Sequence, residues 1–177
     1  MMQQFNYVIA EVSADGKTYL VDATDPLRPF NLLPFECLNK TGRLISITES
    51  GFVDLKNNKI SADSNSYNIT IDREGHVTGN LKFKYSGYSA YDVRRMVRLE
   101  GEEGYLDLFR TFSPYAEISG FKIANLKDPD SDMILTSEFK VTDGAQIAGD
   151  KIIFNTLLSM VIDKNSFYSR ERVFPVD

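Results

Sequence analysis

The sequence predicts a mainly β protein: an antiparallel β-sandwich with one or two short helices at about residues 89–112, preceded by a β-hairpin and a Pro-rich loop. Three observations predict this class. Short runs of β-branched and aromatic residues recur between turn residues, several runs alternate apolar and polar side chains, and one window has helical spacing. The 177 residues are 42% hydrophobic and 25% charged, which is sufficient for a packed core.

The chain begins with a predicted hairpin and a predicted packed loop. Residues 5–12 and 17–22 read as strands, and Asp15-Gly16 between them is a strong hairpin signal. Residues 25–35 then contain three prolines, which exclude a regular helix or a central strand. Because apolar residues lie between these prolines, we expect an ordered loop that packs against the rest of the protein.

A change of pattern after Gly42 predicts a domain boundary there, with residues 1–42 as one unit and residues 43–177 as a β-sandwich. Short strands are predicted at 44–47 and 52–55. A clearer hairpin follows, in which alternating runs at 67–71 and 77–85 flank a turn at residues 73–75. This alternation indicates one buried face and one solvated face.

A helix is predicted after the second hairpin. Ser89 is a candidate N-cap with Asp92 three residues later, and apolar residues then recur at three- and four-residue spacing. Gly101 and Gly104 interrupt this pattern, which predicts two short helices or one broken helix ending before Pro114. Four further strands are predicted at 117–124, 133–141, 151–154 and 167–176.

Composition argues against several classes of function. The net charge is -5, and the only dense basic group, Arg94, Arg95 and Arg98, reads as a solvated helix face. We therefore expect no nucleic-acid partner, because such proteins carry a basic surface that neutralises phosphates. No apolar run reaches the ~18 residues of a membrane span. Cys37 is the only cysteine, so no internal disulfide forms.

Few residues are candidates for chemistry. Asp22 ends a predicted strand and suits either a turn cap or the orienting carboxylate of a catalytic triad. His76 lies in a hairpin turn and is expected to be solvated, and Cys37 is expected to be a buried apolar side chain. The run Asp128, Asp130 and Asp132 lacks the glycine and glutamate of a calcium loop and reads as a turn. No metal and no cofactor is predicted.

Tyrosines gather where the second hairpin meets the helix. Tyr85, Tyr88, Tyr91 and Tyr105 favour packing between helix and sheet, and the alternative is a surface for a glycan or peptide ligand. On that alternative, Tyr88 and Tyr91 are the candidate binding residues.

Residues 5–10, 15–17 and 19–26 together resemble the last two strands of the transglutaminase-like (Cys-His-Asp) domain. The rest of the chain resembles the uncharacterised β-sandwich domain that follows such cores in exported proteins of Bacteroidetes-type bacteria. Residues 85–90, Arg94 and the closing residues 172–177 carry this second resemblance.

The resemblance assigns catalytic positions to this chain without the catalytic groups. Asp22 matches the aspartate of the family triad, and Tyr7 stands fifteen positions earlier, where the family has histidine. A phenol, with a pKa of about 10, cannot replace imidazole as a base at neutral pH. The family's nucleophilic cysteine precedes both positions, and Cys37 follows them.

The resemblance thus implies a non-catalytic accessory β-domain, structural or ligand-binding, in a larger exported or periplasmic protein. Upstream domains of that protein would be its partners, and both ends of the chain are expected to lie within a longer sequence. Two alternatives stay open. One is a fragment of an active cysteine protease or acyltransferase with an upstream nucleophile, and the other is a glycan- or peptide-binding module.

Overall fold

The computed structural model describes residues 7–38, 40–56, 61–112 and 115–155. The chain is mainly β with antiparallel sheets, which confirms the predicted fold class. In chain order the elements are β1 (Ala10–Ala14), β2 (Lys17–Val21), a 3-10 turn η1 (Phe35–Cys37), β3 (Lys40–Ile45), β4 (Ser50–Leu55), β5 (Asp63–Ile71), β6 (Val77–Tyr85), α1 (Gly87–Phe112), β7 (Ala116–Ala124), β8 (Met133–Val141), β9 (Ala145–Ala148) and β10 (Lys151–Phe154).

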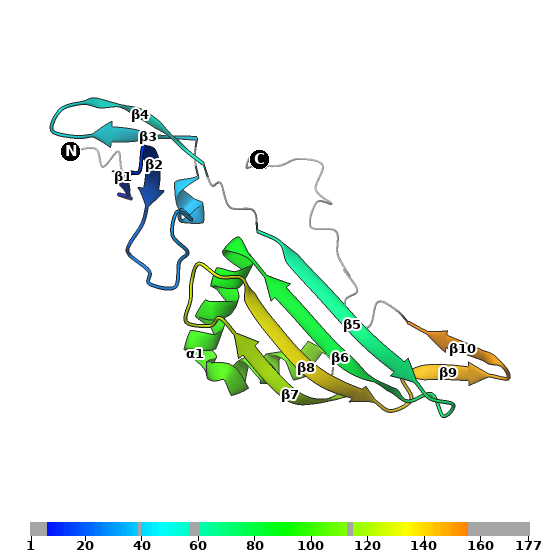
Figure 1. The fold of residues 1–177 in the computed structure, drawn as a ribbon. Coiled ribbons are helices and arrows are strands. Elements are labelled where there is room, and N and C mark those ends of the chain that lie inside the picture. Colours follow the sequence, from blue (N-terminus) through cyan, green and yellow to red (C-terminus); the bar gives the residue numbers. More distant parts are fainter. Residues whose placement is uncertain (1–6, 39, 57–60, 113–114, 156–177) are drawn as a thin grey trace, which may run out of the picture.

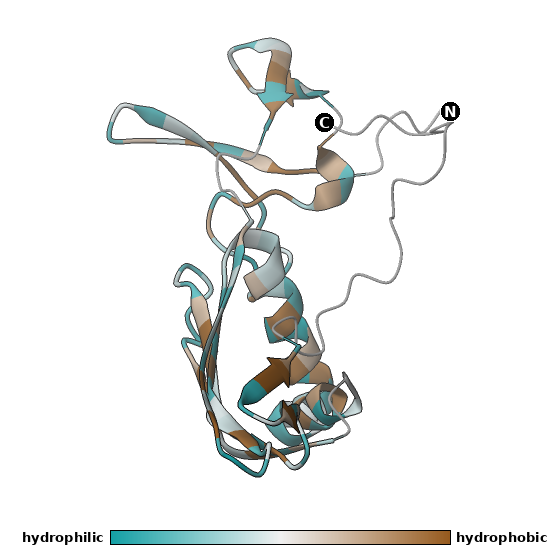
Figure 2. Ribbon diagram, turned by 90° about the vertical axis from the view of Figure 1, so that its right-hand side faces the viewer, coloured by the Kyte–Doolittle hydropathy of each residue, from teal (hydrophilic) through white to brown (hydrophobic). Residues whose placement is uncertain are grey.

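A four-stranded antiparallel sheet and α1 form the main body. The strands lie in the order β5-β6-β8-β7, and α1 covers one face of the sheet (Figures 1 and 2). The core between them follows from alternation in the two central strands. In β6, for example, Val77, Leu81 and Phe83 are buried, while Thr78 and Lys82 are exposed. Since successive side chains of a strand point to opposite faces, one face packs on α1 and the other meets solvent.

The helix α1 is broken, as the sequence predicts. Gly101 has φ 76° and ψ 169°, which interrupts the helix between two shorter segments. The predicted N-cap, however, is wrong: α1 begins at Gly87, and Ser89 lies inside the first turn. The first turn is capped from elsewhere, because the backbone N–H of Tyr88 donates to Oγ of Ser61 at 2.8 Å.

Two separate hairpins precede the main body. β1 pairs with β2 around Asp15-Gly16, where positive φ angles of 50° and 71° suit a tight hairpin turn. β3 pairs with β4 over six residues on each strand. The boundary predicted after Gly42 falls within β3, so a division of the chain at that residue would cut a paired strand.

The later strands match the predictions with two qualifications. The first is that β9, which pairs with β10, was not predicted from the sequence. The second is that the predicted strand at residues 167–176 lies outside the described residues.

The Pro-rich loop is packed, as expected. Leu32, Leu33 and Pro34 are each less than 2% exposed. A loop buried to this extent must satisfy its backbone polar groups locally, and it does so in part through bonds from Arg28 N to Asp25 O and from Leu32 N to Pro29 O.

Arg94 corrects the expectation of a solvated basic face. Arg94 is 1% exposed and is the largest of the fully buried side chains. Arg95 and Arg98, in contrast, are exposed. The guanidinium of Arg94 donates to the backbone carbonyls of a single loop between β7 and β8: those of Asn125, Asp128, Pro129 and Ser131. Arg94 therefore holds this loop against α1.

Candidate functional site

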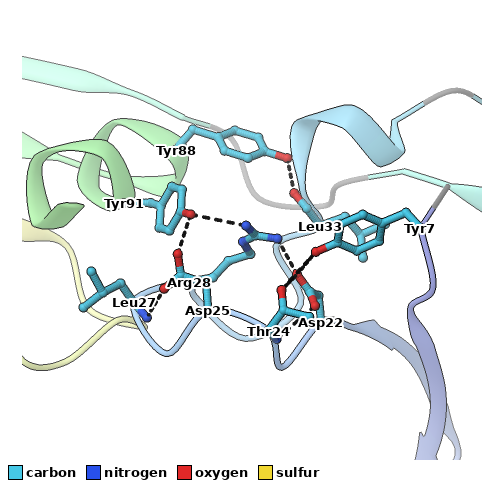
Figure 3. A network of polar contacts seen from close by, with 9 residues as sticks. All are labelled: Tyr7, Asp22, Thr24, Asp25, Leu27, Arg28, Leu33, Tyr88 and Tyr91. Atoms are coloured by element: carbon cyan, nitrogen blue, oxygen red, sulfur yellow. Dashed lines mark hydrogen bonds and ion pairs between the residues drawn. The ribbon is translucent and has the colours of Figure 1, made fainter.

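Asp22 lies just after β2, and its carboxylate is almost completely enclosed, with 1% of the side chain exposed. Oδ1 accepts a hydrogen bond from the backbone N–H of Thr24 at 3.0 Å. Oδ2 accepts from the hydroxyls of Tyr7 and Thr24, each at 2.9 Å, and from Nη1 of Arg28. Both carboxylate oxygens are thus engaged, by Tyr7 and by groups of the segment that follows Asp22 (Figure 3).

Arg28 connects this carboxylate to the helix. Its Nη2 donates to the hydroxyl of Tyr91 at 3.2 Å, and its guanidinium carbon lies 5.2 Å from the centre of that ring. The Tyr91 hydroxyl in turn donates to Oδ2 of Asp25 at 2.7 Å. Oδ1 of Asp25 accepts from the backbone N–H of Leu27 at 2.9 Å, which closes the turn that carries Arg28.

We call this continuous set of contacts the clasp, and it comprises Tyr7, Asp22, Thr24, Asp25, Arg28 and Tyr91. Two further bonds run parallel to it. The Tyr88 hydroxyl donates to the carbonyl of Leu33, and the backbone N–H of Phe30 donates to Oδ1 of Asp130 at 2.8 Å. The clasp therefore fastens the N-terminal segment to the first turns of α1.

The contacts of the clasp keep the carboxyl groups of Asp22 and Asp25 ionised. Burial alone raises the pKa of Asp22, but hydrogen bonds from Thr24 and Tyr7 and the charge of Arg28 outweigh it, so the net pKa is lowered. The pKa of Asp25 is also lowered, because bonds from Leu27 and Tyr91 and the charge of Arg28 exceed the opposing effect of burial. Neither carboxyl carries a proton to donate at neutral pH.

The two positions that the resemblance pairs do lie together. Tyr7 donates to Asp22 across fifteen residues of sequence. Tyr7, which the resemblance places at the family's histidine position, carries a phenol, and its hydroxyl also lies 2.9 Å from Oγ1 of Thr24. The arrangement can hold a carboxylate in place, but it offers no imidazole to accept a proton from a nucleophile.

Cys37 is close to this site but is unsuited to attack a substrate. The side chain is buried, with 6% exposure. Burial raises the pKa of its thiol, and the negative charges of Glu36 and Asp22 raise it further against the opposing effect of Arg28. A nucleophilic cysteine requires the reverse, a lowered pKa and access to solvent.

The other candidates lie outside the clasp. His76 is in the β5–β6 turn, where its backbone N–H donates to Asp72 Oδ1 at 2.8 Å. Asp128 caps its own loop through Ser131 and the backbone of Asp130, and Asp132 pairs with Lys84 at 2.8 Å. Among the residues that the structure describes, no three His, Cys, Asp or Glu side chains gather as a metal site.

The two tyrosines predicted for binding face the Pro-rich loop. Tyr91 is 8% exposed with its hydroxyl shared between Asp25 and Arg28, and Tyr88 is half-buried with its hydroxyl on Leu33. The edge-on contact of Tyr88 with Phe35 is a packing contact. A glycan- or peptide-binding role for this pair stays a prediction, and the surface that such a ligand could reach here is small.

Arg28 is the functional residue that sequence reasoning missed. It lies between Pro26 and Pro29 in a loop, where nothing in the local pattern indicates a buried cation. The available signal was the nearby pair of carboxylates, Asp22 and Asp25, since buried charges are normally paired.

Removal of the Tyr7 hydroxyl gives a direct check on this site. For Tyr7→Phe we expect the free energy of unfolding to fall by about 1–2 kcal/mol, because a hydrogen bond to a charged group is lost while the ring is kept. Urea unfolding followed by circular dichroism measures it. Tyr115→Phe, at an 85% exposed tyrosine, is the matched control. An unchanged midpoint for Tyr7→Phe would show that the hydroxyl is not engaged.

The geometry thus defines a class of site: a buried, charge-paired carboxylate whose contacts link two segments of the chain. Searches against protein-family models, curated proteins and solved structures find no match to this chain. Within the described ranges, no helix has both the length and the apolar character needed to cross a membrane.

Proposed function

We propose that this chain is a non-catalytic accessory β-domain of a larger exported protein, in which Asp22 acts as a structural anchor. One observation carries the proposal. The Asp22 carboxylate is 1% exposed, and its oxygens accept four hydrogen bonds, one of them from the guanidinium of Arg28. The charge of a carboxylate bound in this way is balanced by Arg28, and both of its oxygens are already engaged, so neither is available to a histidine.

The contrast with a working triad supports this assignment. In a triad the carboxylate orients an imidazole and stabilises the imidazolium that forms during reaction. Here a guanidinium that stays charged at any physiological pH already provides the positive charge beside Asp22. The N-terminal hairpin, the Pro-rich loop and α1 are instead drawn together by the same contacts. Asp22, at the position of the family's catalytic aspartate, therefore serves in this chain to join these segments.

The alternative is a fragment of an active acyltransferase or protease, and one observation favours it. Tyr7 and Asp22 occupy the positions that the resemblance pairs, and their side chains lie 2.9 Å apart. On that reading, an upstream cysteine would complete the site and Tyr7 would assist it. The same contact is expected if Tyr7 only anchors Asp22, so activity must distinguish the two.

Amine incorporation by the complete gene product tests the proposal. Transfer of dansylcadaverine to casein glutamines, and hydrolysis of casein, are measured for the wild type, Tyr7→Phe and Tyr115→Phe. We expect all three at the level of the buffer blank, because no base is present at position 7. Product above the blank in the wild type that disappears only in folded Tyr7→Phe would overturn the proposal and establish the enzyme reading.

A further inference from the structure

The outer face of the four-stranded sheet, opposite α1, carries a shallow groove of about 550 Å³ across all four strands. Two rows of polar side chains line it, and each row crosses the strands in register. The first row joins Asn68, Asn80, Glu138 and Ser119. None of these four side chains has a hydrogen-bond or ion-pair partner among the described residues. The donors and acceptors of these side chains therefore line the groove without a partner among the described residues.

The second row lies two residues further along each strand, on the same face, and joins Thr70, Thr78, Lys140 and Glu117. Lys140 and Glu117 stand directly opposite each other, yet no ion pair forms between them in the described part of the chain. The groove thus combines amides, hydroxyls, two carboxylates and one ammonium, each free to bond with a ligand.

The groove is bordered by an irregularity in β7. The register of β7 against β8 shifts between Ser119 and Lys122, and Gly120 has a positive φ of 59°. The buried hydroxyl of Ser137 donates to the carbonyl of Ser119 at 2.7 Å, which fixes the bulge in place. Bulges recur beside binding sites because they redirect side chains. Here the bulge begins at Ser119, the residue that ends the first row.

We propose that this groove binds a neutral oligosaccharide of two or three sugar units. Sugar hydroxyls both donate and accept, which suits rows in which amides and hydroxyls do both, carboxylates accept and Lys140 donates. Two carboxylates against one ammonium disfavour a polyanion. The volume lies within the range of small-molecule sites. This site is separate from the clasp, and it stands or falls independently of the proposed accessory role.

NMR titration of the ¹⁵N-labelled chain tests the site. Cellotriose, maltotriose, xylotriose and mannotriose are the neutral probes, and trigalacturonate is the anionic one. Each is added to about 10 mM, a range that detects millimolar dissociation constants. We expect at least one neutral trisaccharide to shift the side-chain amides of Asn68 and Asn80 saturably. Asn80→Ala should weaken that binding about tenfold, the effect of losing one to two hydrogen bonds.

Ser64→Ala is the matched control, since Ser64 lies on the same face of β5 but outside the groove. It should leave the affinity unchanged. Asn68→Ala serves as a second groove variant if Asn80→Ala does not fold. The proposal is overturned if no neutral probe shifts either amide, if the shifts centre on Tyr88 and Tyr91 instead, or if trigalacturonate binds as tightly as the best neutral probe.

Discussion

Asp22→Ala is expected to lower the free energy of unfolding by about 3–5 kcal/mol, the range seen when one partner of a buried ion pair is removed. The reason is that Arg28, with 9% of its side chain exposed, is then left buried without the carboxylate that it contacts directly. Urea unfolding at neutral pH measures the loss. Asp54→Ala is the control, because Asp54 pairs with Lys56 at the surface with 65% of its side chain exposed. Its midpoint should stay unchanged, and an equal loss in both variants would contradict this account.

The same carboxylate predicts how stability depends on pH. The folded pKa of Asp22 is lowered relative to about 3.9 in the unfolded chain. A lowered folded pKa means that the contribution of Asp22 is complete above about pH 4 and is lost as the pH falls through the folded value. The stability difference between wild type and Asp22→Asn should therefore be constant from pH 5 to 7 and shrink in more acid solution. A difference that grows in acid would reverse the sign and contradict the account.

Arg94→Met is the second large effect, with an expected loss of about 3–4 kcal/mol. Its guanidinium donates at 2.6 Å to the carbonyls of Asp128 and Ser131 and more loosely to two others, and each bond contributes about 1 kcal/mol. Methionine keeps much of the volume but donates no hydrogen bond to these carbonyls. Thermal unfolding should show a fall of roughly 10 °C for a chain of this size.

Two further variants identify the cause. Arg94→Lys keeps the charge but not the planar fork, so it should lose about half as much as Arg94→Met. Arg98→Met changes an exposed arginine on the same helix and should leave the melting temperature unchanged. Equal losses for Arg94→Met and Arg98→Met would mean that the bonds to the β7–β8 loop contribute nothing.

Local signals predicted the elements that depend on local chemistry. Asp15-Gly16 indicated the first hairpin because that pair readily adopts positive φ angles. Gly101 indicated the break in α1 for a similar reason. The alternation in β6 indicated which face is buried, because side chains in a strand have a period of two.

Contacts between distant segments could not be predicted in the same way. The cap of α1 comes from Ser61, twenty-seven residues before Tyr88, so the local candidate Ser89 was the wrong choice. Arg94 looked like one of three equivalent arginines, and only the β7–β8 loop, more than thirty residues later, makes it a buried one. The link from Arg28 to Tyr91 spans sixty-three residues. Such pairings depend on the whole fold.

A double-mutant cycle on Asp22→Asn and Arg28→Met tests the central claim, that Asp22 serves as a structural anchor through its pairing with Arg28. The cycle compares the unfolding free energies of the wild type, both single variants and the double variant. We predict a coupling energy of about 2 kcal/mol, because residues of one buried network interact strongly. Losses that add within about 0.5 kcal/mol, the limit for independent sites, would show that the pair does not act as an anchor.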